Sequence, residues 1–220
     1  MKRLTILMAL LIATSGWAYD ELDLIKFKSI NKCMGCDLSG ADLRNGDFRN
    51  ADLKNANLTN VNFSEAKLGY ANLVNANLSG ANFKKANLER AKLDEANLTE
   101  ANFHDAWIYF ASFREAYLSK VNFSSAYLNS SDFYRAYLGG VNFSEAYLEG
   151  VYFSNTNLTD ANFSRADLFR ANLDETNLSN VNFTKASNLK NITLDKSLYC
   201  NTTMPWGVLN DSCDLLNTTN

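Results

Sequence analysis

A five-residue pattern repeats without a break from Cys36 to Lys185, and no other feature limits the possible fold as strongly. Each of the thirty units reads A-[DN]-[LF]-x-x: a small residue, a polar residue, a large apolar residue and two variable positions. The large position holds 18 leucines, 11 phenylalanines and one isoleucine, so it is never polar. A short repeat that stays in phase over this length is typical of a solenoid, in which each unit packs on its neighbours.

The odd length of the repeat requires a bend in every unit. Side chains of an extended chain alternate between its two sides with a period of two residues. A five-residue repeat would therefore reverse its inward side each time unless the chain turned once per unit. We expect the small and large positions to point inward, the polar position to point outward, and the two variable residues, such as Ser79 and Gly80, to form a corner.

A second period, of 20 residues, indicates how many corners close one coil. The large positions spaced by 20 from 63 to 183 are all phenylalanine, and those from 58 to 178 are all leucine. Columns of identical residues at this spacing predict four units per turn, with each side chain above its counterpart in the coil below. Thirty units then make about seven and a half coils. The rod would be roughly 35 Å long at the usual spacing between strands.

The repeats also resemble a known family. Runs such as A-D-L-R-N, A-N-L-T-N and A-N-F-K-K are similar to those of the pentapeptide repeat family, over about two-thirds of the chain. The resemblance implies an all-β solenoid in the form of a right-handed quadrilateral β-helix, and the handedness comes from the resemblance alone. We expect a short cap at each end, because an open solenoid exposes unpaired strand edges and apolar core.

The two ends of the chain depart from the repeat. Residues 1–18 combine Lys2 and Arg3 with a short apolar stretch and small residues near Ala18, which is typical of a secretory signal peptide. We expect an N-terminal cap over 19–35, the β-helix over 36–185 and a C-terminal cap over 186–220. The apolar residues of 20–32 predict a short amphipathic helix or strand over the first coil. No other segment is apolar enough to span a bilayer. Because of the signal peptide, we expect an exported protein in the periplasm, a lumen or the extracellular space.

The four cysteines form two close pairs, Cys33 with Cys36 and Cys200 with Cys213. In a solenoid these pairs lie at opposite ends, which excludes pairing across them and also a zinc site that uses all four. In an exported protein we expect two local disulfides, one in each cap. A redox-active pair at Cys33 and Cys36 remains as an alternative.

Aromatic residues replace the usual polar residues on the outside of the middle coils. Because of their spacing, Trp107, Tyr127 and Tyr147 should share one face, and Tyr117 and Tyr137 the opposite face. The full candidate interaction surface comprises Trp107, Tyr109, Phe110, Tyr117, Tyr127, Tyr134, Tyr137, Tyr147 and Tyr152. Contiguous exposed apolar surface favours a binding role, whereas columns of tyrosine that stabilise a sheet by stacking are the structural alternative.

The sequence offers little for catalysis or for nucleic acid. The single histidine, His104, should point outward beside Lys84 and Ser124, and we expect no Ser-His-Asp set around it. We expect no catalytic residue, cofactor or metal site. The formal net charge of -3 is spread along the rod and includes no basic stripe for nucleic acid.

These observations predict a non-catalytic protein that acts as a protein-interaction or structural module through its outer surface. The partner would be another protein or a second copy of the chain in a dimer. The alternative is a solenoid that binds a glycan or ice, through the aromatic residues or through hydroxyl groups in register beside the leucine column. These hydroxyl residues are Ser39, Thr59, Ser79, Thr99, Ser119, Thr159 and Ser179.

Overall fold

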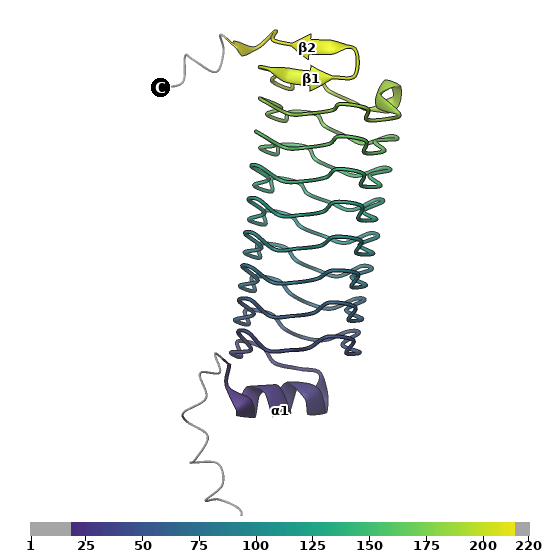
Figure 1. The fold of residues 1–220 in the computed structure, drawn as a ribbon. Coiled ribbons are helices and arrows are strands. Elements are labelled where there is room, and N and C mark those ends of the chain that lie inside the picture. The colour runs from purple at the N-terminus through teal and green to yellow at the C-terminus, as the bar shows by residue number, and fades with distance from the viewer. Residues whose placement is uncertain (1–18, 214–220) are drawn as a thin grey trace, which may run out of the picture.

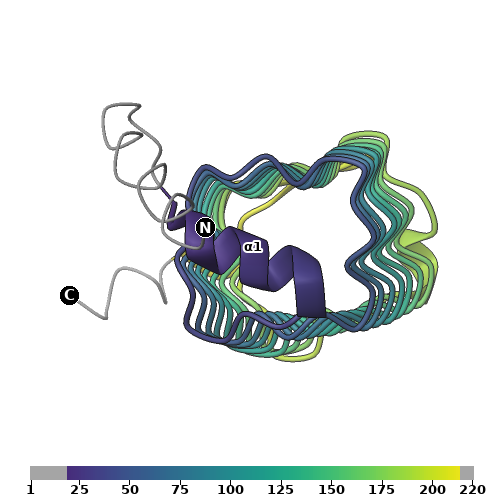
Figure 2. The ribbon, with the colours of Figure 1, turned by 90° about the horizontal axis from the view of Figure 1, so that it is seen from below.

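The computed structural model describes residues 19–213, and the predicted signal peptide over residues 1–18 lies outside them. The described chain winds into a four-sided coil whose turns stack into a rod (Figures 1 and 2). Parallel bridges join residues 20 apart on all four sides, as between Asn57 and Asn77 and between Asn62 and Asn82. The predicted four-unit turn is therefore confirmed.

Backbone hydrogen bonds join each coil to the next and close each corner. The Leu58 N–H donates to the carbonyl of Asn77 at 2.7 Å, and the Asn77 N–H donates to the carbonyl of Ala56 at 2.9 Å. At the corner, the Val61 N–H donates to the Leu58 carbonyl three residues earlier at 3.1 Å, which makes a β-turn. The second corner residue, here Asn60, has a φ of 56°. Asparagine and glycine tolerate this left-handed conformation best, which explains their frequency at this position.

The polar residue of the repeat stabilises both the corner and the stacking of the coils. The Asn57 Oδ1 accepts the Thr59 N–H at 3.3 Å and so braces its own corner. The Asn82 Nδ2 donates to the Asn62 Oδ1 of the previous coil at 3.1 Å. A short amide side chain reaches both partners, which is the physical reason for Asn at this outward position.

Phenylalanine and leucine fill the bore of the rod. The predicted phenylalanine column forms one interior file, in which successive ring centroids lie 4.5–5.4 Å apart. A second file, from Phe113 through Phe133 to Phe153, extends from the opposite wall. Its rings meet the first file edge-on, with Phe123 5.9 Å from Phe113 and 5.8 Å from Phe133. The two files interlock across the bore, so the interior is packed with side chains.

The coil begins before the predicted boundary at residue 36. Lys32 bridges Asp52, and the Cys33 N–H donates to the Asp52 carbonyl at 2.7 Å. Cys33 is fully buried and occupies the large inward position, five residues before Leu38. The predicted cap over 19–35 therefore contains the start of the coil, because cysteine is apolar enough to take the place of leucine.

Helix α1 (Glu21–Ile30) covers this first turn and lies across the end of the tube (Figure 2). Its N-cap, Asp20, accepts the backbone N–H groups of Leu22 and Asp23. Phe27 is buried and stacks on Phe48 at 4.9 Å. A helix was one of the two predicted forms of this segment, but it is not amphipathic, because its outer side also exposes apolar residues. Among the described residues, no helix has the length and apolar character needed to cross a membrane.

The coil also continues beyond residue 185. Asp167 bridges Ser187 at the usual spacing, and Asn172 bridges Thr193, 21 residues away. The 3-10 helix η1 (Leu189–Asn191) absorbs the extra residue at a corner, after which the ladder resumes. The first part of the predicted cap over 186–220 is therefore a further coil. Strand β1 (Thr202–Met204) forms the last side of this coil, where Thr203 bridges Asn182, and it pairs antiparallel with β2 (Gly207–Leu209) at the end of the rod (Figure 1).

A disulfide lies at each end of the rod, between Cys33 and Cys36 and between Cys200 and Cys213. We expect replacement of Cys200 and Cys213 by serine to destabilise the terminal hairpin by about 3 kcal/mol, because the bond closes a loop of roughly 15 residues. Hydrogen exchange should accelerate in β1 and β2 and stay unchanged near Phe103. Faster exchange along the whole rod would contradict this local role.

Candidate interaction surface

One side of the rod, here called the Trp107 face, carries Trp107, Tyr127 and Tyr147 in three successive coils. The rings of Tyr127 and Tyr147 are parallel within 1° and 4.7 Å apart. Tyr109 lies beside them, 6.1 Å from Tyr127, and burial raises the pKa of its hydroxyl group. Trp107 stands at one end of this column with 46% of its surface exposed.

The other predicted aromatic residues lie on different sides. Tyr117 and Tyr137 stack on the opposite side, 5.0 Å apart and parallel within 3°. The ring of Tyr134 lies 5.4 Å from the guanidinium group of Arg114 and 5.1 Å from that of Arg135. Tyr152 is exposed on the side between these two faces. The nine predicted residues therefore extend over three of the four sides, here called the aromatic belt, and do not meet in a single patch.

The stacking of the tyrosines limits what they can bind. A sugar ring binds an aromatic side chain by lying on its face. Tyr127 and Tyr147 lie face to face, as do Tyr117 and Tyr137, so each pair presents mainly ring edges and hydroxyl groups. This geometry agrees with the structural role of tyrosine columns and disfavours a platform for stacked glycans.

The hydroxyl column beside the leucine wall is also engaged internally. Thr59 Oγ1 donates to Asn57 Oδ1 at 2.8 Å, and Thr99 and Ser179 make the same bond to the asparagine two residues earlier. Their donors serve the corners of the coil. A regular hydroxyl lattice facing an ordered surface such as ice is therefore disfavoured.

The aromatic belt extends further toward the N-terminus than the sequence interpretation placed it. The guanidinium group of Arg90 lies 5.2 Å from the ring of Phe110 and 5.7 Å from that of Tyr70. It also donates to the Tyr70 hydroxyl oxygen at 2.7 Å. Tyr70, Arg90 and Phe110 are second corner residues spaced by 20, so the same period that revealed the other columns could have found this one.

A groove of about 410 Å³ opens on the Trp107 face between this corner and Trp107. It exists because Gly69 has no side chain, which leaves the backbone and Ala66 as part of its lining. Arg49 also lines it and is held by Asp47 at 2.6 Å. The remaining lining residues are Glu65, Lys67, Tyr70, Lys85, Asn87, Glu89 and Trp107.

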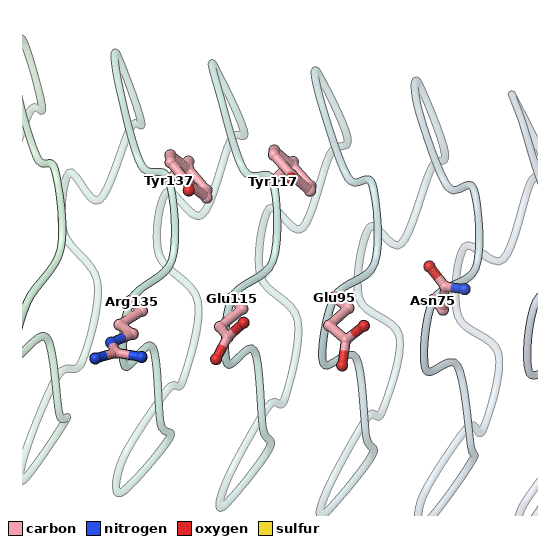
Figure 3. Close-up of a pocket in the computed structure, with 6 residues that line it drawn as sticks. All are labelled: Asn75, Glu95, Glu115, Tyr117, Arg135 and Tyr137. Carbon is pink, nitrogen blue, oxygen red and sulfur yellow. The ribbon is translucent and has the colours of Figure 1, made fainter.

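A second groove, of about 420 Å³, runs beside Tyr117 and Tyr137 (Figure 3). The two parallel rings form one side, and the corner residues Asn75, Glu95, Glu115 and Arg135 form the other. Its charged side chains belong to a single column that changes from acidic to basic along the rod. This groove is more polar than the one over Gly69 and contains no tryptophan.

His104 has the neighbours of a catalytic triad, contrary to the expectation from sequence. Its Nδ1 lies 2.9 Å from Ser124 Oγ, and its Nε2 lies 3.2 Å from Asp105 Oδ2. The same Nδ1 is 3.0 Å from the backbone carbonyl oxygen of Ser124, which can only accept a hydrogen bond. A proton on Nδ1 satisfies this carbonyl and leaves no lone pair there to receive the serine proton, so this tautomer does not activate a nucleophile.

One group in the described part of the chain has the spacing of a metal site. Single ligand atoms of Asp23, Cys33 and Cys36 lie within 4.8 Å of one another. Both sulfur atoms are joined in the disulfide, whereas a cysteine binds metal as a free thiolate. Asp23 Oδ2 instead accepts the Asp37 N–H at 2.9 Å and so fixes α1 to the first coil.

Two sequence models of one family match most of the solenoid. The pentapeptide repeat region matches residues 32–103, and pentapeptide repeats (8 copies) match 108–144, 136–173, 146–184 and 161–197. The chain belongs to the pentapeptide repeat family, a class of structural repeat proteins, and its coil is a right-handed quadrilateral β-helix. Among curated proteins, none matches this sequence.

Several solved structures are similar to this chain. HetL, a pentapeptide repeat protein involved in heterocyst differentiation regulation in the cyanobacterium Nostoc sp. strain PCC 7120, is 24% identical, with 85% of this chain and 98% of HetL covered and a TM-score of 0.46. QnrB1, a plasmid-mediated fluoroquinolone resistance protein, is 19% identical, with 77% and 87% covered and a TM-score of 0.45. A pentapeptide repeat protein of the Arabidopsis thaliana thylakoid lumen is 27% identical, with 48% and 69% covered and a TM-score of 0.22.

Proposed function

We propose that this protein is an exported, non-catalytic interaction module that binds a partner protein through the Trp107 face. The observation that carries the proposal is the groove over Gly69, which opens beside a half-exposed tryptophan on a rod whose interior is filled. Tryptophan, tyrosine and arginine contribute most to binding in protein interfaces, and Trp107, Tyr70 and Arg49 line this groove. Phe110, 55% exposed, extends the apolar surface at its edge.

The charges of the groove indicate the chemistry of the partner. Among the described residues, Lys67, Lys85 and Glu65 make no ion pair, whereas Glu89 lies 3.8 Å from Arg90 and Arg49 is paired with Asp47. Two ammonium groups beside a tryptophan suit a partner segment that places a carboxylate next to an apolar side chain. The Coulomb attraction would orient the segment, and burial against Trp107 would hold it.

The setting of this interaction is proposed from the ends of the chain. A signal peptide over residues 1–18 would export the protein, and a disulfide at each end suits an oxidising compartment. The partner would then be another exported protein.

Two substitutions test the groove directly. Gly69→Leu should fill it without disturbing the fold, because an added Cβ would lie 3.6 Å from its nearest neighbour. Trp107→Ser removes the apolar anchor. A carbodiimide, which couples amines to carboxylates in contact, should join Lys67 or Lys85 of the wild-type protein to a partner in its native compartment. We expect each variant to reduce these cross-links at least tenfold.

Gly139→Leu is the matched control. Gly139 is also a first corner residue, and a Cβ there would meet nothing within 4 Å. This variant should keep the cross-links, and all three variants should keep the circular dichroism spectrum of the wild type. Cross-links at Lys67 and Lys85 that survive both Gly69→Leu and Trp107→Ser would refute the proposed site.

A further inference from the structure

Helix α1 is apolar on two opposite sides. Its inner side packs on the first coil through Phe27, which is fully buried, and Leu24, which is partly buried. Its outer side leaves Leu22 77% exposed and Ile25 62% exposed. A helix that only closes the end of a solenoid needs one apolar side, because the other side faces water.

The exposed apolar surface extends beyond the helix to the rim of the rod. Ile30, at the end of α1, and Met34, in the first turn, are 57% and 61% exposed. Figure 2 shows α1 lying across the end of the tube. Four large apolar side chains are thus gathered on one end of the protein.

We propose that two copies of this chain associate end to end, through the outer side of α1, about a two-fold axis. The charges on the helix favour a second copy in antiparallel orientation. The exposed Glu21 lies in its first turn and the exposed Lys28 in its last turn, whereas the Asp23 carboxylate already accepts the Asp37 N–H of the first coil. A two-fold axis near Ile25 places the acidic start of each helix beside the basic end of the other, and opposes the two helix dipoles.

The outer side of α1 also has a shape that allows close approach. With the axis between Ile25 and Lys26, Leu22 of one copy faces the small side chain of Ser29 of the other. The Ser29 hydroxyl already donates to the Ile25 carbonyl at 2.7 Å, so its polarity is satisfied within the helix. A large residue opposite a small one is the arrangement that lets antiparallel helices interdigitate.

The predicted contact is small. Helix α1 has 10 residues, about 15 Å in length, whereas a standard interface buries roughly 800 Å² on each partner. We therefore expect a dimer that dissociates on dilution. The contact leaves the Trp107 face open, so it does not depend on the binding role proposed for that face.

Charge at position 25 tests the proposal. Ile25→Glu places two carboxylates near the axis, and Ile25→Lys places two ammonium groups there. Each variant, produced without the proposed signal peptide over residues 1–18, should be monomeric in sedimentation equilibrium, with a dissociation constant raised at least about 100-fold, because two apolar contacts are lost at about tenfold each. An equimolar mixture of the two variants should form a heterodimer, because the opposite charges meet across the axis.

Val208→Glu is the control at the far end of the rod, where Val208 is also exposed. We expect this variant to dimerise like the wild type, and all variants to keep the wild-type circular dichroism spectrum. A wild-type chain that stays monomeric at every concentration would overturn the proposal. So would a dimer that is lost with Val208→Glu and kept with Ile25→Glu, or a mixture of the two position-25 variants that stays monomeric.

Discussion

Replacement of Phe123 by alanine is expected to lower the free energy of unfolding by about 3–5 kcal/mol. Phe123 is fully buried and stacks on Phe103 at 4.9 Å and on Phe143 at 5.1 Å. It also meets Phe113 and Phe133 edge-on. The substitution leaves a cavity where the two phenylalanine files interlock, and stacked backbones on both sides prevent its collapse. Urea unfolding followed by circular dichroism measures the loss.

Phe110→Ala is the matched control, because it makes the same chemical change on the outside of the rod. Phe110 contacts the guanidinium group of Arg90 and is more than half exposed. We expect this substitution to cost less than about 1 kcal/mol. Similar losses for the two variants would show that the phenylalanine file is not the densely packed interior described above.

Deletion of one complete coil is expected to leave a folded, shorter rod. Without residues 101–120, Phe123 would follow Phe83 at the spacing of 20, and every column would close up by one position. Each coil contacts only its neighbours, so the two new neighbours can form the same bonds. We expect a β-rich circular dichroism spectrum, cooperative thermal unfolding, and a decrease in rod length of about 4.8 Å by small-angle scattering.

Deletion of residues 101–122 is the control, because it removes only two residues more. The corner at Thr99 and Glu100 would then run directly into Phe123, without the small and polar residues that form the side of the coil. One coil would be two residues short and could not close. We expect loss of cooperative unfolding. Equal stability of the two deletion variants would contradict the four-cornered coil.

Much of the solenoid was predictable because the inward positions are read directly from the period. The phenylalanine file and the four sides both follow from the recurrence of residues every 20 positions. The ends were harder to predict. Cys33 replaces a leucine, and an extra residue at η1 (Leu189–Asn191) shifts the last coil by one, so the simple pattern stops before the coil does.

The candidate surface was predictable only in outline. The sequence shows which aromatic side chains face outward, but the face-to-face packing of Tyr127 and Tyr147 depends on their rotamers. The groove arises from a missing side chain at Gly69 together with the walls around it. The contacts of His104 with Ser124 and Asp105 depend on the orientation of the imidazole ring.

By itself, the amino-acid sequence determined the four-sided coil and the composition of its interior, because the repeat sets which side chains turn inward and which lie above one another. Only the tertiary structure decided how the outer rings are oriented, where the grooves open, and that α1 exposes a second apolar side. These features depend on distances between side chains that different coils bring together, and such distances are set by packing rather than by sequence spacing.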